Sequence, residues 1–300
     1  MFKLPNGVDI NNLIDNLRIF SWEAAQYMLH YSQFFKDGDY KSHVLNKGNK
    51  EDPVTMADLK VNEIIIKRIG DHYKDIKWGI LSEENVKLGK GICNREFDWL
   101  WVLDPLDGTK DFIQATGNYA MHLALNYKNR PYLGIVLIPE KGELWFAYED
   151  KVWFENKEGS KFKVNLPKNK SLQEMTLVTS KNHRNEALKN LIQKINFKEV
   201  IIMGSIGCKI ASIVRGESDI YICLSLPGKS CPKDWDFAAP AAILKAAGGA
   251  ITNINNKELS YNESNFEQGG IIVATNNNLN HREICIEVKE IIRRFEIYPL

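Results

Sequence analysis

The stretch Asp104-Pro-Leu-Asp-Gly-Thr109 directly follows the apolar run Trp99-Leu-Trp-Val-Leu103. The apolar run predicts a buried β-strand that ends where the first carboxylate begins. The two aspartates stand three positions apart on a turn that contains Pro105 and Gly108, so both can point to one place beyond the strand. Carboxylates paired in this way suit a hard cation such as Mg²⁺, which prefers oxygen ligands.

The residues after this turn predict a short helix from Lys110 to about Gln114. The backbone N–H groups of Gly108 and Thr109 would open that helix, and a helix N-terminus attracts phosphate. A cation and a phosphate group would then lie side by side. The alternative is an ordinary strand-to-helix turn whose acids face water, and a single pair of aspartates favours that alternative.

Three further segments carry acids beside predicted elements. Asp52-Pro-Val-Thr-Met-Ala-Asp58 leads into a helix with apolar residues at helical spacing, and Leu81-Ser-Glu-Glu-Asn85 follows a short apolar run. Lys233-Asp-Trp-Asp-Phe-Ala-Ala-Pro240 begins an alanine-rich helix that ends at Gly248-Gly249. Each acid alone is most often a helix cap or a solvated surface charge. Only the combination of these acids, in this order, indicates a functional site.

Together the four segments resemble the lithium-sensitive, Mg²⁺-dependent phosphomonoesterases of the inositol monophosphatase superfamily. Its signature is an acid after V-T-x-x, then E-E, then D-P-[IL]-D-G-T, then W-D-x-A with A-G-G downstream. All four blocks stand here in that order, and the resemblance covers roughly residues 50 to 250. It implies a layered α-β-α-β-α sandwich, an α/β fold with which the predicted order of elements is compatible.

The resemblance also implies a metal site. The bound ion would be Mg²⁺, and its ligands would be the side chains of Glu83, Asp104, Asp107 and Asp236 together with the backbone carbonyl of Leu106. Closely spaced divalent ions can activate water, neutralise the phosphoryl charge and stabilise the leaving alkoxide.

Asp58 and Thr109 match the residues that orient the attacking water in relatives. A threonine hydroxyl can connect a water to a carboxylate, which is suitable geometry for general-base catalysis. The alternative role of Thr109 is helix capping. Glu84 either binds metal or acts in support of its neighbour Glu83.

The variable positions bear on the substrate. Thr109-Lys-Asp-Phe112 has the T-K-[DE]-F form that resembles the 3′(2′),5′-bisphosphate nucleotidases of sulfur assimilation, whereas inositol monophosphatases usually read T-T-N-F. Ser180-Lys-Asn-His183, Gly204-Ser205 with Lys209, and Lys233-Asp-Trp-Asp236 resemble further elements of that subfamily. The substrate-binding residues so implied are Gly108, Thr109, His183, Gly204, Ser205, Lys209 and Asp236.

A second phosphate on the substrate needs its own cation and N–H donors, which these residues can supply. Plain structural roles remain open for three of them. Lys209 could be a solvated helix charge, His183 a loop histidine, and Gly204-Ser205 a simple helix entry.

The composition is that of a globular protein. The 300 residues are 44% apolar and 26% charged with a net charge of +1, so no broad basic surface points to nucleic acid. No run approaches the roughly 20 apolar residues of a membrane-spanning helix, and none near the start has signal-peptide character. Five scattered cysteines predict reduced thiols. We therefore expect a cytoplasmic enzyme that acts on a small phosphate ester, as a monomer or homodimer.

Two halves are predicted, residues 1–165 with most metal-binding segments and residues 166–300 with the Trp-Asp segment and the substrate-binding elements. Strand-like runs between 119 and 154 predict an antiparallel meander, and strands alternate with helices from 176 to 294. The polar segment 36–51 is a candidate lid over the site, and an ordinary surface loop is the alternative.

The resulting hypothesis is hydrolysis of 3′-phosphoadenosine 5′-phosphate to AMP and phosphate. One alternative is an inositol, histidinol or sugar phosphatase with the same metals. A second, from another class, is a catalytically silent relative that senses Mg²⁺ or a nucleotide. The presence of both Asp58 and Thr109 argues against the silent relative, because binding alone does not need them.

Overall fold

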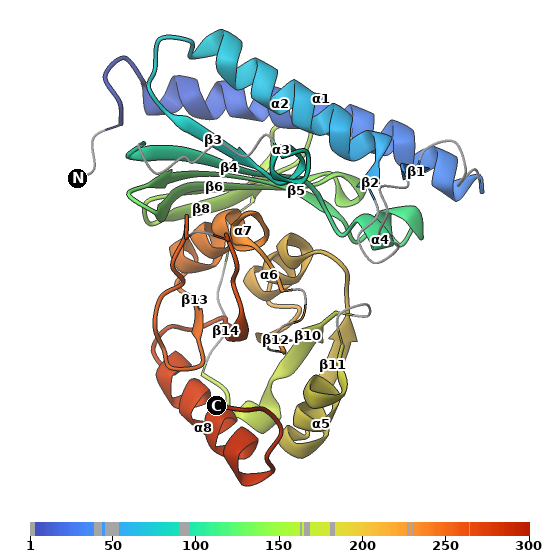
Figure 1. The fold of residues 1–300 in the computed structure, drawn as a ribbon, viewed down its shortest axis with the longest axis vertical. Coiled ribbons are helices and arrows are strands. Elements are labelled where there is room, and N and C mark those ends of the chain that lie inside the picture. Colours follow the sequence, from blue (N-terminus) through green and yellow to red (C-terminus); the bar gives the residue numbers. More distant parts are fainter. Residues whose placement is uncertain are drawn as a thin grey trace.

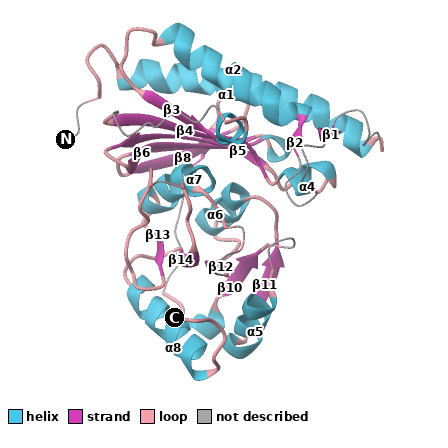
Figure 2. Ribbon diagram, viewed as in Figure 1, coloured by secondary structure: helices cyan, strands magenta, loops and turns pink. Residues whose placement is uncertain are grey.

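The computed structural model describes residues 4–38, 44–45, 54–89, 97–162, 164, 169–180, 184–226, 229, 231–263 and 265–300. Helices and sheets alternate in five layers, α-β-α-β-α, from one end of the molecule to the other (Figures 1 and 2). The predicted layered α/β sandwich is confirmed.

The first layer is a pair of long helices, α1 (Ile10–Lys36) and α2 (Met56–His72), which lie side by side over the larger sheet (Figure 1). Their apolar faces form one core with that sheet. The helix α2 follows the short strand β2 (Val54–Thr55), which pairs antiparallel with β1 (Val44–Leu45).

The second layer is a seven-stranded sheet in the order β3-β4-β5-β6-β7-β8-β9. From β4 onward every neighbouring pair is antiparallel, which confirms the predicted meander, and β3 pairs parallel with β4. Its strands are β3 (Gly79–Ser82), β4 (Trp99–Asp107), β5 (Ala120–Tyr127), β6 (Arg130–Ile138), β7 (Glu143–Tyr148), β8 (Lys151–Glu155) and β9 (Lys161–Phe162). Two short helices, α3 (Glu83–Lys87) and α4 (Thr109–Ile113), follow β3 and β4.

A bulge near the end of β4 places Asp104 and Asp107 on the same face of the sheet. In a regular strand, residues three apart point to opposite faces. Here the partners shift from Asp104 with His122 to Asp107 with Ala120, so β4 has one residue more than β5 over this step. Leu106 consequently joins the core under α1 and α2, while Asp107 faces the first turn of the helix that begins at Ile206. Bulges that re-aim side chains in this way are common beside active sites.

The middle layer consists of α6 (Ile206–Val214) and α7 (Asp234–Ala246), which lie between the two sheets (Figure 1). Every residue of α6 is buried. The close packing of α7 on β6 requires Gly134, because a Cβ there would stand 2.7 Å from the Ala239 carbonyl oxygen and from the Ala242 side chain. Both helices begin at the edge where β4 ends, and this brings their first turns to the acidic residues.

The fourth layer is a five-stranded sheet in the order β11-β10-β12-β14-β13, and the fifth is the pair α5 and α8 on its outer face. Neighbours of β10 are parallel to it, and β14 is antiparallel to both of its neighbours. The bounds are β10 (Thr176–Thr179), α5 (Glu186–Ile195), β11 (Glu199–Ile202), β12 (Ile220–Ser225), β13 (Ala250–Asn253), β14 (Gly270–Thr275) and α8 (His281–Arg294).

Several expectations stay open or change in detail. The helix after the metal turn begins at Thr109, one residue earlier than expected. Most of segment 36–51 and the boundary between residues 165 and 166 lie outside the described residues, so the lid and the two halves stay predictions. Among the described helices, none is both long enough and apolar enough to cross a membrane.

Candidate active site

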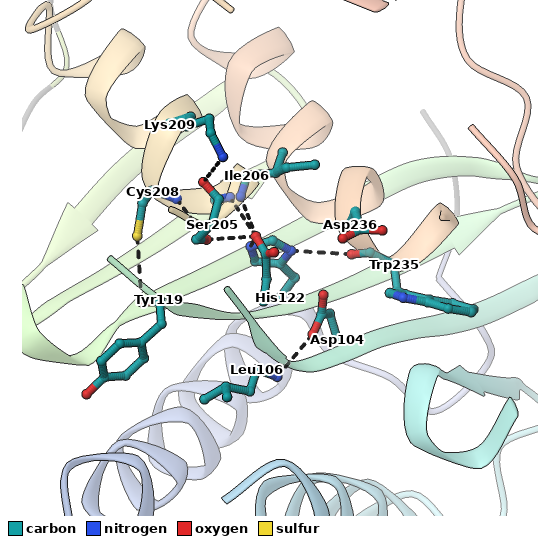
Figure 3. A network of polar contacts seen from close by, with 12 residues as sticks. Asp104, Leu106, Tyr119, His122, Ser205, Ile206, Cys208, Lys209, Trp235 and Asp236 are labelled. Atoms are coloured by element: carbon teal, nitrogen blue, oxygen red, sulfur yellow. Dashed lines mark hydrogen bonds and ion pairs between the residues drawn. The ribbon is translucent and has the colours of Figure 1, made fainter. Parts of the chain in front are cut away.

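Three carboxylates meet where the larger sheet faces the middle helices. Asp104 and Asp107 come from the end of β4, and Asp236 comes from the first turn of α7. One ligand atom from each can be chosen so that all three lie within 4.8 Å of one another. Figure 3 shows Asp104 on β4 and Asp236 on α7, at the place where the sheet meets the helix. The sequence predicted all three as metal ligands, and the fold brings them together from positions up to 132 apart (236 − 104).

The electrostatics of this cluster fit a bound cation. Burial raises the pKa of Asp104 well above its usual range, and Glu83, Asp107 and Asp236 raise it further. Burial likewise raises the pKa of Asp236, with Asp107 and Glu83 adding to the effect. Buried like charges repel one another unless a positive charge lies between them. An all-oxygen donor set of this kind suits a hard divalent ion.

The two oxygens of Asp107 have different surroundings. Its Oδ2 accepts hydrogen bonds from the Ser205 hydroxyl at 2.7 Å, from the backbone N–H of Ile206, and from the backbone N–H of Gly207 at 3.3 Å. Asp107 therefore caps the N-terminus of α6, which carries a partial positive charge. No hydrogen bond from a described residue reaches its Oδ1, which is left for a cation.

Glu83 and Glu84 form the first turn of α3, and both lie near the ammonium group of Lys87. Lys87 Nζ lies 2.8 Å from Glu83 Oε1 and 3.7 Å from Glu84 Oε1. Glu83 is close enough to raise the pKa of Asp104 and Asp236, although it lies outside the cluster of three acids. Glu84 is fully buried. Metal binding by either glutamate remains a prediction.

Asp58 and Thr109 approach each other across the turn of β4. Thr109 Oγ1 lies 3.4 Å from Asp58 Oδ1 and 3.1 Å from the Leu106 carbonyl oxygen, so its one hydrogen can serve either. Asp58 Oδ2 accepts hydrogen bonds from the Thr55 backbone at 2.8 Å and from the Thr55 hydroxyl at 2.5 Å. These bonds fix the carboxylate at the start of α2 and leave Oδ1 directed at Thr109.

Burial raises the pKa of Asp58 to about 7, and the nearby Glu84 and Glu83 add to the effect. A general base is most effective when its pKa lies near the working pH, because it is then both deprotonated and basic. The environment of Asp58 therefore suits the acceptance of a proton.

The two turns predicted to bind substrate, at Gly108-Thr109 and at Gly204-Ser205, are in direct contact with each other. Gly108 has a φ of 88°, and a Cβ there would stand 2.9 Å from the Asn118 carbonyl oxygen and 3.1 Å from the Ser205 nitrogen. A Cβ at Gly204 would overlap the Asp111 carboxylate. Only glycine fits at either position, so the backbone of the β4 turn lies directly against the turn that opens α6.

Lys209 is not a solvated helix charge, because only 3% of it is exposed. Its Nζ donates to the Ser205 carbonyl oxygen at 3.0 Å (Figure 3), and burial lowers its pKa. The ammonium therefore lies beneath the Ser205 turn. His183 lies outside the described residues, and its predicted contact stays a prediction.

One residue of this junction was missed by the sequence analysis. His122 of β5 is fully buried, with Nε2 3.3 Å from Asp107 Oδ2 and Nδ1 3.3 Å from the Trp235 carbonyl oxygen (Figure 3). A lone histidine in an apolar strand gives no signal of this position. The cross-strand register with Asp104 places it there, and register is a property of the folded sheet.

Comparisons with known proteins agree with this geometry. A model of the inositol monophosphatase family matches residues 14–293. The chain is 34% identical over 236 residues to the 3′(2′),5′-bisphosphate nucleotidase CysQ of Buchnera aphidicola subsp. Acyrthosiphon pisum (strain APS), covering 79% of this chain and 82% of the relative.

Solved structures show the same fold at lower identity. The extragenic suppressor protein suhB from Bartonella henselae superposes with a TM-score of 0.72 at 20% identity, covering 94% of this chain and 99% of the other. CysQ from Bacteroides thetaiotaomicron superposes with a TM-score of 0.67 at 24% identity, covering 88% of this chain and 98% of the other. Because the family model spans nearly the whole chain, this protein is a metal-dependent phosphatase that belongs to the inositol monophosphatase family.

Proposed function

We propose that this enzyme hydrolyses 3′-phosphoadenosine 5′-phosphate to AMP and inorganic phosphate with Mg²⁺. The observation that carries the reaction type is the meeting of three carboxylates, the buried Asp104 and the half-buried Asp107 and Asp236, beside the Asp58–Thr109 pair. The choice of substrate is supported by the similarity to the Buchnera nucleotidase and by the Thr109-Lys-Asp-Phe112 sequence at the turn.

Asp104, Asp107 through its Oδ1, and Asp236 would hold the metal, with Glu83 and the Leu106 carbonyl as further proposed ligands. When bound, Mg²⁺ supplies charge neutralisation at the phosphoryl group and at the leaving 3′ oxygen. The chain's own contribution is to hold these oxygens in a buried site, where electrostatic interactions are stronger than in water.

Asp58 and Thr109 would activate the attacking water. The water donates a hydrogen bond to Thr109 Oγ1, whose own hydrogen points at Asp58 Oδ1, 3.4 Å away. As the water oxygen bonds to phosphorus and the bond to the 3′ oxygen breaks, the proton leaves the water toward Asp58, and the departing 3′ oxygen takes up a proton from solvent to give the 3′ hydroxyl of AMP. A carboxylate with a pKa of about 7 can accept it.

Substrate binding would use the two adjacent turns. The backbone N–H groups of Gly108 and Thr109 would contact the reacting 3′-phosphate. The 5′-phosphate would lie near Gly204, Ser205 and His183, with the buried ammonium of Lys209 beneath. Because that ammonium already donates to the Ser205 carbonyl, it would both attract the second phosphate and fix the turn that receives it.

A phosphate-release screen tests the proposal. Purified enzyme with Mg²⁺ is compared on 3′-phosphoadenosine 5′-phosphate, 3′-AMP, inositol monophosphate and histidinol phosphate at equal concentrations. We expect the bisphosphate to have the highest kcat/KM. A preference for inositol or histidinol phosphate would replace the nucleotidase by another phosphatase of the family. Nucleotide binding without turnover would show a silent relative.

A further inference from the structure

The imidazole of His122 connects two elements that carry the clustered acids. Its Nε2 lies 3.3 Å from Asp107 Oδ2 at the end of β4. On the other side of the ring, Nδ1 lies 3.3 Å from the carbonyl oxygen of Trp235, the residue directly before Asp236 in α7. One rigid ring thus spans the gap between β4 and the first turn of α7 (Figure 3).

Both neighbours of this ring are hydrogen-bond acceptors. An imidazole in its neutral form has only one N–H. It therefore cannot donate to the Asp107 carboxylate and to the Trp235 carbonyl together. Nε2 has no partner in hydrogen-bond geometry among the described residues, despite its place 3.3 Å from a carboxylate oxygen. A buried polar atom without a partner destabilises the fold, so an apolar side chain would serve packing alone better.

The ring is also in contact with α6. A Cβ on Gly207 would overlap His122 Nε2 and would stand 2.8 Å from Val136 Cγ1. Gly207 in turn donates its backbone N–H to the same Asp107 oxygen at 3.3 Å. The imidazole therefore meets β4, α6 and α7 at once, and a change in its size or polarity reaches all three.

We propose that His122 is a positioning residue of the metal site, which spaces the Asp107 carboxylate from the first turn of α7 and thereby sets the separation of Asp107 and Asp236. This inference rests on the proposed metal site. The clustered acids repel one another, and a bound ion tolerates only small deviations in ligand position, of about 0.5 Å. A residue that holds the elements apart without binding the ion would maintain that separation. Loss of such supporting contacts typically weakens metal affinity about 10–100-fold.

Mn²⁺ binding to the metal-free full-length protein tests this role without substrate. Free Mn²⁺ is measured by electron paramagnetic resonance during a titration. His122→Leu replaces the imidazole by an apolar side chain of similar size. His122→Gln places an amide near the position of Nε2, and His122→Asn places an amide near the position of Nδ1. The matched control is Asn126→Leu, which removes a buried polar side chain on the same face of β5, about 13 Å along the strand from His122.

We expect His122→Leu to weaken Mn²⁺ binding about 10–100-fold. His122→Gln and His122→Asn should each bind several-fold more tightly than His122→Leu but still several-fold more weakly than the wild type, and Asn126→Leu should bind as the wild type does. With saturating metal, KM for the substrate should stay near the wild-type value in all variants. Circular dichroism confirms that each variant is folded.

Wild-type affinity in His122→Leu would overturn the inference, as would equal losses in the three His122 variants, which would indicate packing alone. If His122→Leu does not fold, wild-type affinity in both amide variants would overturn it. Failure of the wild-type protein itself to bind Mn²⁺ would instead reject the proposed metal site.

Discussion

Asp107 Oδ2 accepts a 2.7 Å hydrogen bond from the hydroxyl of Ser205, which lies 98 positions further along the chain. The bond joins the end of β4 to the start of α6 and orients the carboxylate. Oδ2 is therefore used to cap α6, whereas Oδ1 remains available to the cluster of acids. Substitutions at Asp107 should consequently affect stability and catalysis separately.

Asp107→Asn should remove most phosphate release, because it removes one negative charge from the metal site. The amide oxygen can still accept from Ser205, so the thermal midpoint measured in EDTA should remain close to that of the wild type. Asp107→Ala should lose the activity and also about 1 kcal/mol of unfolding free energy, as expected for the loss of a helix cap. Full turnover by Asp107→Asn, or by the wild type in EDTA, would contradict the assignment.

Asp58→Asn and Thr109→Ala should each lower kcat by about 10²–10⁴-fold, the usual contribution of general-base assistance. Mg²⁺ and substrate affinity should change little. Because the two residues act on one proton, the double variant should lose little more than either single variant. Steady-state kinetics of all three variants provide the comparison. If the loss of kcat in the double variant equals the product of the two single losses, the two residues do not act on the same proton.

Lys209→Met should raise KM for 3′-phosphoadenosine 5′-phosphate roughly ten- to a hundredfold, since a hydrogen bond to a charged group contributes about 1.5–3 kcal/mol. Methionine fills most of the buried space that an alanine would leave empty. KM for 3′-AMP, which lacks the second phosphate, should change little. The control is Lys245→Met on the exposed surface of α7. Equal penalties on both substrates would show that Lys209 only supports the Ser205 turn.

Acid should destabilise the fold through His281. This buried side chain lies 2.8 Å from the hydroxyls of both Thr275 and Thr252, and burial lowers its pKa from 6.5 to about 4. Between these values the unfolded chain binds the proton and the folded chain does not, so stability falls as pH decreases from 6.5 to 4. The contribution is at most about 3 kcal/mol.

Urea unfolding at several pH values measures this effect. His281→Asn should be less stable at neutral pH but should show a smaller loss of stability between pH 6.5 and 4. His30→Gln, at an exposed position on α1, should keep the wild-type pH dependence. An unchanged slope in His281→Asn would assign the acid sensitivity to other groups.

The order of elements and the acids of the site could be predicted from sequence because both depend on local patterns. Strand-like apolar runs separated by turn residues predicted β5 to β8, and helical spacing predicted α2. The aspartates at the end of β4 and at the start of α7 were identified by their neighbours in the chain. The layered sandwich itself came from the resemblance to a family, since periodicity alone indicated only an α/β protein in two halves.

The tertiary structure decided what depends on contacts between distant segments. The bulge in β4 turns Asp107 to the face of Asp104, because β4 and β5 pair out of step there. The burial of Lys209 follows from the position of α6 between two sheets. His122 gained its place between Asp107 and Trp235 in the same way. Register and layer packing are fixed by the whole hydrophobic core at once, so no local pattern around these residues could have specified them.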